Sequence, residues 1–357
     1  MSELSGSALA LLLYDVCEEI DLEELDRTLG GKRLTVPSRR QAPEHVRFQR
    51  PPVIEQLDAM VLVNGQQVGA ELKYYDYGVI SIVIEMPFKG DWDGIIQLAN
   101  TWIASTEFEK VASAIIRQKL ERARAAIIKP NPEWLMEDYF VFHLVKTDDA
   151  VDAETLVAKH GMQIAQMVRG ESTPLATKEK DEVLQSSLSY YPTDLAVIGW
   201  HAAFIFDTAE GADMAIHLLE YANSQLLEFR HYDDLLTREL EVVYKSLDRG
   251  TGLRLWRLVR QANRLQTVAL EVTQLTERAD NAIKFLRDMF SARLYQLAAE
   301  KIGVWDYEEL VNRKLKMADE LYRSITDQFQ QARAFLLESM VVIILLIELS
   351  FVFTGKR

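Results

Sequence analysis

The chain has 357 residues, 48% of them hydrophobic, and a net charge of −14 at pH 7. This length provides for two or three structural units, and the apolar fraction is sufficient to build a core in each. The negative charge repels a phosphate backbone, so the composition argues against nucleic acid as a partner. A single cysteine, Cys17, excludes an intrachain disulfide and a multi-cysteine zinc site.

The first apolar run of the chain is ALALLL, at residues 8–13. No basic residue precedes it, and an acidic stretch follows at 18–26, so the run differs from a signal peptide or a transit peptide. We therefore expect an amphipathic first helix at this position.

Three runs between residues 57 and 85 alternate between apolar and polar side chains, which is the pattern of half-buried strands. Asn64 and Gly65 separate the first two runs, and this dipeptide favours the type I′ turn of a hairpin. The pattern predicts an antiparallel meander with strands at 57–63, 68–75 and 79–85.

Helices and strands then follow in groups instead of alternating. We expect the body to be α+β, with an antiparallel-rich sheet and flanking helices over residues 1–207. The expected helices are 94–104, 107–128 (stopped by Pro130 and Pro132), 153–168 and 178–187, and the expected strands are 139–145, 195–200 and 203–206.

The pattern becomes purely helical after Asp207. One helix is expected to end at residue 247, before the glycines at 250 and 252, a second to cover 253–301 and a third to start at 306. Apolar residues at 3–4 spacing in the last two helices are typical of a coiled coil. Residues 208–334 are thus predicted to form long helices that include a coiled-coil-like antiparallel hairpin.

Residues 335–353 read FLLESMVVIILLIELSFVF and contain two charges. A helix of this length spans about 28 Å, close to the roughly 30 Å hydrocarbon core of a bilayer. The alternative is a buried core helix, but the length favours a transmembrane helix followed by a short basic tail at 354–357. Basic residues are concentrated before the span, which predicts a cytoplasmic body. They are Arg313, Lys314, Lys316, Arg323 and Arg333, against Lys356 and Arg357 after it.

The two charges within this span are Glu338 and Glu348. Glu338 lies near the first end, whereas Glu348 lies past the midpoint, where a carboxylate costs up to about 3 kcal/mol. We expect Glu348 to face another helix, which indicates a homo-oligomer within membrane lipid.

The common sequence motifs of catalysis and cofactor binding are absent from the chain. The chain contains no GxxxxGK[ST], GxSxG or HExxH, and its six histidines never recur at helical i, i+3 or i, i+4 spacing. We therefore expect no catalytic residue, no metal site and no cofactor.

Three polar clusters offer weaker candidate sites. Asp91 and Asp93 could bind a divalent cation, although capping of the following helix is the favoured interpretation. A second cluster could form a buried proton-handling network, but a solvated helix face with an Arg230–Asp234 pair is favoured. Its members are Glu228, Arg230, His231 and Asp234.

The third cluster is a row of arginines on one face of the second long helix. Such a row could contact the phosphate groups of anionic lipid or RNA, but a solvated flank of a coiled coil is favoured. Its members are Arg254, Arg257, Arg260 and Arg264.

Three segments carry a family resemblance: DLAVIGW at 194–200, AIHLLEYANSQLLEFR at 215–230 and LESMVVIILLIEL at 337–349. They resemble the domain of unknown function in the required-for-meiotic-nuclear-division proteins and their bacterial relatives, over residues 194–353. The resemblance implies a membrane-anchored protein without an established enzymatic activity. Because no transit peptide is evident, it implies a bacterial-type member in the inner membrane.

These observations predict a tail-anchored scaffold without enzymatic activity. It would self-associate through its helical hairpin and present the α+β body to a cytosolic protein. The alternative is a ligand-binding sensor or an enzyme with a pocket near Asp91, Asp93 or Glu85. A deep polar pocket would favour the alternative, and a filled interface between sheet and helices would favour the scaffold.

Overall fold

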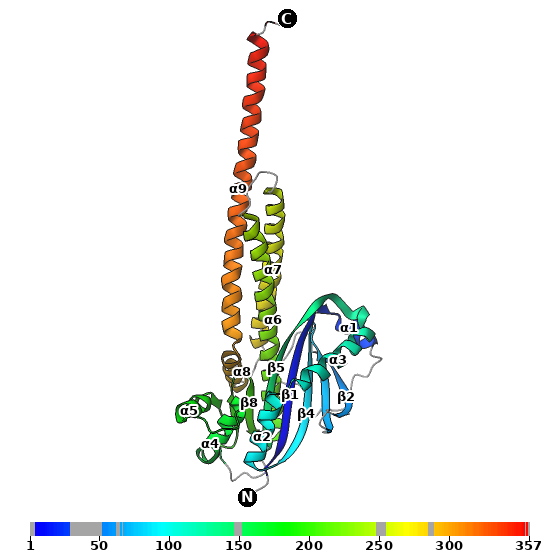
Figure 1. Ribbon diagram of the computed structural model, residues 1–357, viewed down its shortest axis with the longest axis vertical. Helices are drawn as coiled ribbons and strands as arrows, with labels where there is room; N and C mark the ends of the chain where they lie inside the picture. Colours follow the sequence, from blue (N-terminus) through cyan, green and yellow to red (C-terminus); the bar gives the residue numbers. More distant parts are fainter. Residues whose placement is uncertain are drawn as a thin grey trace. The chain divides into compact units, whose positions relative to one another are not determined.

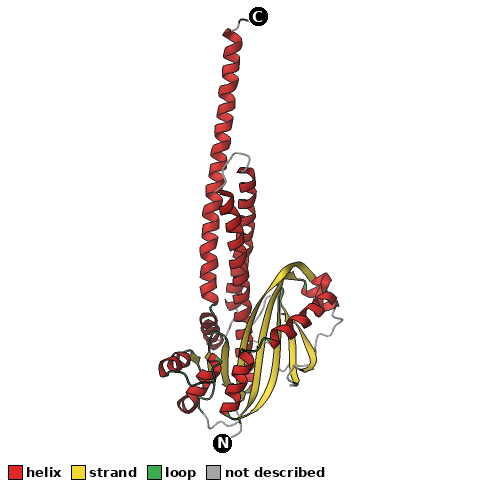
Figure 2. Ribbon diagram, in the orientation of Figure 1, coloured by secondary structure: helices red, strands yellow, loops and turns green. Residues whose placement is uncertain are grey.

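The computed structural model of the protein describes residues 4–28, 52–61, 65, 67–145, 152–247, 255–284, 289–353 and 355. These residues form a mostly antiparallel sheet with helices and a series of long helices, which confirms the predicted fold class (Figures 1 and 2). Contacts divide the chain into unit 1, Met1–His231 with Arg278–Tyr307, and unit 2, Tyr232–Glu277 with Glu308–Arg357. The predicted boundaries at residues 207 and 334 remain a prediction.

The sheet of unit 1 has eight strands in the order β2-β3-β4-β1-β5-β8-β7-β6. Neighbouring strands are antiparallel except for the parallel pair β5 and β8. The strands are β1 Leu4–Ile20, β2 Val53–Val61, β3 Gln67–Tyr74, β4 Val79–Gly90, β5 Ile127–Val145, β6 Ser187–Leu188, β7 Leu195–Ile198 and β8 Ala202–Asp207.

Residues 8–13 lie in the middle of β1, so the predicted first helix is wrong. Strand β1 pairs with β4 on one side and β5 on the other, and its residues 8–13 are all at most 1% exposed. Ala8, Ala10 and Leu12 belong to one core, while the alternate side chains point to the opposite face of the sheet. A strand buried on both faces is continuously apolar, and this pattern alone cannot be distinguished from a buried helix.

The predicted meander is present as β2, β3 and β4. Gly65 has a φ of +81°, as a tight turn requires, while Asn64 lies outside the described residues. The second turn is bound to β1, because Ile20 N donates to the carbonyl of Asp76 and Val16 N donates to that of Gly78. This turn requires glycine: Gly78 has a φ of +91°, and an added Cβ would lie 1.7 Å from the carbonyl oxygen of Cys17.

One face of the sheet is covered by four helices, α2 to α5, which share a single core with it (Figure 1). Helix α3 ends earlier than predicted, and Pro130 and Pro132 belong to β5 instead of a loop. A register shift between Asp15 and Cys17 accommodates them, since proline is tolerated where the ladder is irregular. The helices are α1 Leu22–Thr28, α2 Trp92–Ile103, α3 Glu107–Arg122, α4 Ala153–Arg169 and α5 Thr177–Gln185.

The opposite face of the sheet carries the first part of α6 (Ala209–Leu247), and we call it the α6 face. Within unit 1, α6 also contacts α8 (Met289–Ile302), where Tyr295 donates a hydrogen bond to Gln225. The structure describes two parts of the predicted helix at 253–301, α7 (Leu255–Lys284) and α8, and residues 285–288 lie outside the described residues. Gly303, with a φ of +93°, separates α8 from α9 (Val304–Phe353).

Unit 2 contains the second part of α6, most of α7 and most of α9, with α7 antiparallel to the other two (Figure 1). Lys314 of α9 lies 2.5 Å from the carboxylate of Asp233, and Arg264 of α7 lies 2.7 Å from that of Glu239. The turn predicted at 249–252 lies outside the described residues. The 3–4 spacing of apolar residues is reflected in the buried side chains. These are Leu236, Leu240, Val243, Leu258, Ala262, Leu265, Val268, Val272, Val311, Ala318 and Ile325.

Replacing Gly78 with alanine should destabilise unit 1 by about 2–3 kcal/mol, because the new Cβ would overlap a backbone carbonyl. The matched control is Gly65→Ala, which also has a positive φ but has open space around the Cβ position. It should cost only about 1 kcal/mol. Urea unfolding of the full chain in detergent measures both, and equal losses would contradict the proposed clash.

Candidate functional site

Helix α6 turns a polar stripe toward the sheet. Its members His217, Glu220, Ser224, Glu228 and His231 are spaced by three or four residues and therefore share one side of the helix. Side chains from three strands of the α6 face meet them. These are Lys73 of β3, Asp15 of β1 and Glu137 of β5, all buried.

The centre of the stripe is an ion pair between Lys73 and Glu220. Lys73 Nζ lies 2.5 Å from Glu220 Oε2, and the two residues are 2% and 0% exposed. Lys73 Nζ also lies 3.2 Å from His217 Nδ1 and 3.5 Å from Glu71 Oε1. Such a pair holds two charges away from water, which is tolerated only because each has several polar partners.

The surroundings of Glu220 keep its carboxylate ionised. Burial by itself would raise the pKa, but the positive charge of Lys73 and the hydrogen bond and charge of His217 outweigh it and hold the pKa well below its usual range. Burial and Glu220 together raise the pKa of Tyr75 well above its ordinary value. Tyr75 is therefore a neutral donor beside a charged acceptor.

Tyr77 extends the polar contacts from the turn before β4. Its hydroxyl lies 2.9 Å from Ser224 Oγ, and its ring stacks on Tyr75 with 5.2 Å between centroids. Burial raises the pKa of Tyr77 well above its usual value, so this phenol is also neutral. The turn that requires Gly78 thus places both tyrosines against α6.

The second end of the stripe joins α6 to β1 and β5. His231 Nδ1 lies 2.5 Å from Asp15 Oδ2, and the other oxygen of Asp15 accepts a hydrogen bond from Asn131 at 2.8 Å. Arg230 pairs with Glu137, whose pKa is raised by burial against the opposing effect of Arg230. These contacts connect three elements that are distant in sequence.

The predicted solvated helix face at 228–234 is therefore wrong for most of its members. Arg230 and His231 bind carboxylates of the sheet, and Glu228 is 5% exposed. Asp234 is exposed and pairs with Arg238 instead of the predicted Arg230. Arg230 and His231 contact the sheet carboxylates because these carboxylates are buried. A buried charge without a partner costs several kcal/mol of stability, whereas an exposed i, i+4 ion pair contributes only a few tenths of a kcal/mol.

Cys17 lies beside this network but is not a reactive thiol. Burial raises its pKa to about 12, and its Sγ–H donates to the carbonyl of Glu19. Nucleophilic and redox reactions of cysteine require the thiolate, which is absent at neutral pH with such a pKa.

The helix capping that was favoured over a cation site at Asp91 and Asp93 is present in the structure. Asp91 is the N-cap of α2 and accepts a hydrogen bond from Gly94 N at 3.0 Å, while Asp93 lies in the first turn. Both positions are those in which a carboxylate stabilises a helix N-terminus. The described residues contain no group of three His, Cys, Asp or Glu side chains arranged to hold a metal ion.

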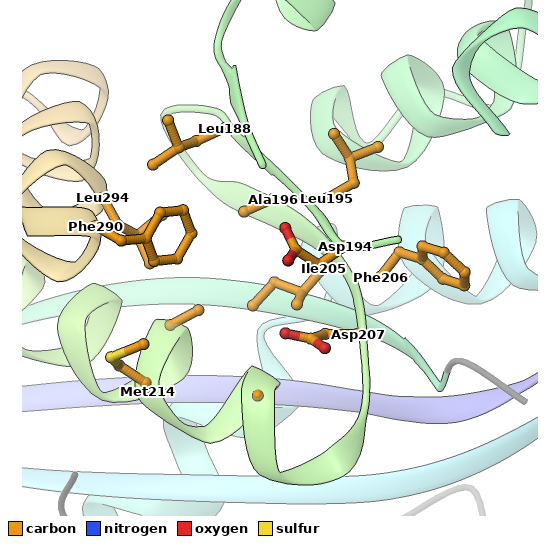
Figure 3. Close-up of a pocket in the computed structure, with 12 residues that line it drawn as sticks. Leu188, Asp194, Leu195, Ala196, Ile205, Phe206, Asp207, Met214, Phe290 and Leu294 are labelled. Carbon is orange, nitrogen blue, oxygen red and sulfur yellow. The ribbon is translucent and has the colours of Figure 1, made fainter. Parts of the chain in front are cut away.

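Figure 3 shows a small hollow in unit 1 between β7, β8, α6 and α8. Its volume is about 20 Å³, which is room for about one water molecule. Two carboxylates border it, but Asp194 accepts from two backbone N–H groups and Asp207 accepts from Thr208 N. Asp91, Asp93 and Glu85 are not among its lining residues.

The structure describes the predicted arginine row in part. Arg254 and the side chain of Arg257 lie outside the described residues. Arg260 is exposed on α7, and Arg264 is engaged with Glu239. The described part of the row is therefore a solvated flank with one ion pair.

The end of α9 is the one described segment that is long and apolar enough to span a membrane. Its 18-residue window has a mean hydropathy of 2.4, and none of the window is buried inside the chain. Glu338 and Glu348 are exposed with the rest of this segment. The described residues provide no cover for this segment, which is consistent with a single-pass membrane anchor.

Comparison with known proteins places the sheet domain in a family. The family described as "Uncharacterized protein MJ0711, N-terminal domain" matches residues 5–213. The uncharacterized protein MJ0711 of Methanocaldococcus jannaschii is 19% identical over 229 residues, which cover 64% of this chain and 70% of that protein. No solved structure matches the chain.

The resemblance to the required-for-meiotic-nuclear-division proteins is therefore wrong. The family that matches covers residues 5–213 instead of 194–353. The segments that suggested the other family are a buried strand, a buried stretch of helix and an apolar helix. Their hydrophobic periodicity reflects secondary structure and burial, which unrelated membrane-anchored proteins share.

Breaking the central ion pair should strongly destabilise unit 1. Glu220→Gln should cost about 3–5 kcal/mol, because Lys73 would remain buried without its counter-charge. The double variant Lys73→Met with Glu220→Leu should recover most of this loss. Urea unfolding checks both, with Glu241→Gln as a control on the exposed Glu241–Lys245 pair, where little change is expected.

The same pair should make stability dependent on acid pH. The pKa of Glu220 is lowered on folding, so its contribution is complete above the unfolded value of about 4.3 and declines as the pH falls from there. Urea midpoints at pH 7 and pH 3 should therefore differ more in the wild type than in Glu220→Gln. An equal difference in both proteins would contradict this linkage.

Proposed function

The chain belongs to the MJ0711 N-terminal-domain family, and we propose that it is a membrane-anchored interaction protein without enzymatic activity. In this proposal α9 spans a membrane once, unit 1 is presented to a protein partner on the cytoplasmic side, and copies of the chain associate with one another. The single observation that carries the proposal is the exposed apolar end of α9.

The physical chemistry of α9 supports the anchor. From residue 335 to 353 the large apolar side chains are 50–81% exposed, which is far more contiguous apolar surface than a soluble monomer displays. Transfer of that surface from water to hydrocarbon is favourable at about 25 cal/mol per Å². Every backbone hydrogen bond of the segment is made within the helix, as a lipid environment requires.

The basic residues that precede the span support a cytoplasmic location for unit 1. The predicted bacterial inner membrane depended on the family resemblance that the comparisons overturned. We therefore retain a single pass and the cytoplasmic orientation without that assignment.

An interaction role is supported by the contacts that fill the α6 face. Lys73 pairs there with Glu220, Arg230 pairs with Glu137, and His231 contacts Asp15. The hollow of about 20 Å³ in Figure 3 has room for about one water molecule and is too small for a metabolite-sized ligand.

Deleting residues 335–357 should move the protein from the membrane fraction to the soluble fraction, because α9 would lose its whole apolar end. The full chain should resist extraction by alkaline carbonate. Glu348→Leu is a matched control that should stay in the membrane, since it removes the deepest charge of the span. Release of the full chain by carbonate would contradict an integral anchor.

The proposed orientation can be tested with cysteines on either side of the span. In a Cys17→Ala background, Lys356→Cys should react with a membrane-impermeant maleimide added to intact cells, whereas Asp319→Cys should react only after lysis. Asp319 lies on α9 before the span and Lys356 follows it. The reverse pattern of labelling would place unit 1 outside the cytoplasm.

A further inference from the structure

Helix α9 packs within unit 2 along a seam with a seven-residue repeat. Val311, Ala318 and Ile325 are seven residues apart and are 0%, 0% and 1% exposed. The residues four positions after each, Leu315, Tyr322 and Phe329, are half-buried. This alternation of three and four residues is the contact pattern of helices that cross at a shallow angle.

The helices that cover this seam end before α9 does. Lys314 pairs with Asp233, and α6 and α9 run parallel in unit 2, so the last residue of α6, Leu247, is level with about residue 328 of α9 (Figure 1). Helix α7 begins at Leu255 on the same level, because its Arg264 pairs with Glu239. Beyond that level the described residues provide α9 with no neighbouring helix.

The repeat itself continues past this level into the apolar end. The continuation, which we call the free seam, follows the covered seam along α9 with the same spacing, and on a straight helix it moves around the axis by only about 20° per seven residues. Its members are Ala332, Leu336, Ser339, Ile343, Leu346 and Ser350. Ala332 and Ser339 are half-buried by their helical neighbours, and the others are exposed.

We propose that the free seam is the interface through which two copies of this chain pair in the membrane. The inference deepens the self-association in the proposed function and rests on the membrane anchor stated there. A lone span needs only apolar composition, whereas both serines of residues 335–353, Ser339 and Ser350, lie on the free seam. The free seam continues an established helix contact without interruption, so a second α9 extends the packing that α6 and α7 begin.

A second copy fits the free seam because of symmetry. All copies cross the membrane in the same direction, so a twofold pair sets each position of the free seam against itself. Ser339 then meets Ser339 and Ser350 meets Ser350, small residues that permit close approach and can hydrogen-bond across the pair. The membrane gives no hydrophobic drive for association, so close packing and such hydrogen bonds hold the pair together.

This geometry places Glu348 away from the interface. It is two residues from both Leu346 and Ser350, or roughly 200° around the helix from each. Its carboxylate then faces lipid about 8 Å from the end of the span at Phe353, within reach of the headgroups. The inference thus departs from the expectation that Glu348 faces another helix.

Disulfide crosslinking of the full chain in membranes separates the two faces. Single cysteines in a Cys17→Ala background would be placed on the free seam at Ser339, Ile343, Leu346 and Ser350. Matched cysteines on the opposite face would be placed at Val341, Ile344 and Glu348. We expect several-fold more dimer from the free-seam positions after mild oxidation, in a pattern that repeats every three to four residues.

The other outcomes each overturn the inference. Preferred crosslinking at 341, 344 and 348 would assign the interface to the Glu348 face, and equal crosslinking at all positions would indicate random collision. Carbonate resistance of each variant reports on the anchor separately. Resistant variants without dimers overturn only the pairing, whereas extracted variants overturn the anchor on which it rests.

Discussion

Strand β1 is covered on both faces, and this constraint determines what the neighbouring elements must supply. Its residues 8–13 are apolar without interruption and are all at most 1% exposed. Helices α2 to α5 supply cover for one face, where apolar side chains form one core. The other face needs a second layer, and α6 and α8 provide it.

The second layer buries charged side chains between the sheet and α6, and these side chains need partners of opposite charge or hydrogen-bonding groups. Five carboxylates of unit 1 are buried in or beside the polar stripe: Asp15, Glu71, Glu137, Glu220 and Glu228. Lys73 and Arg230 each form an ion pair with one of them across the interface between sheet and helix, and His231 contacts Asp15. A buried ion pair contributes little net stability, but breaking it costs several kcal/mol. The network therefore determines the position of α6 on the sheet more than it adds to the stability of unit 1.

Helix α9 is built for two environments. Its first part is amphipathic, with one buried seam and charged sides that include Arg313, Lys314 and Lys316. Its last part is apolar except at Glu338, Ser339, Glu348 and Ser350, and its large apolar side chains are all exposed. The composition of α9 changes along its length while the helix continues unbroken. The helix therefore connects a part that packs against other helices in water to a part suited to hydrocarbon.

Local sequence patterns were sufficient to predict the helices and strands whose buried side chains recur at one regular spacing. The alternating strands β2 to β4, the long helices and the apolar span follow directly from spacing and length, and the fold class was confirmed. The apolar run at 8–13 was misassigned, because a strand buried on both sides and a buried helix have the same composition.

The polar network was decided by the tertiary structure alone. Arg230 and His231 have suitable partners within their own helix, and the sequence offers no reason to prefer Glu137 or Asp15. Lys73 and Glu220 are 147 residues apart and carry no motif, and a lysine between Leu72 and Tyr74 fits the alternation of a strand with one solvated face. Spacing in the sequence determines which side chains share one face of a helix or strand. Which charged side chains pair across two elements depends on how the elements pack, because packing determines which charges are removed from water.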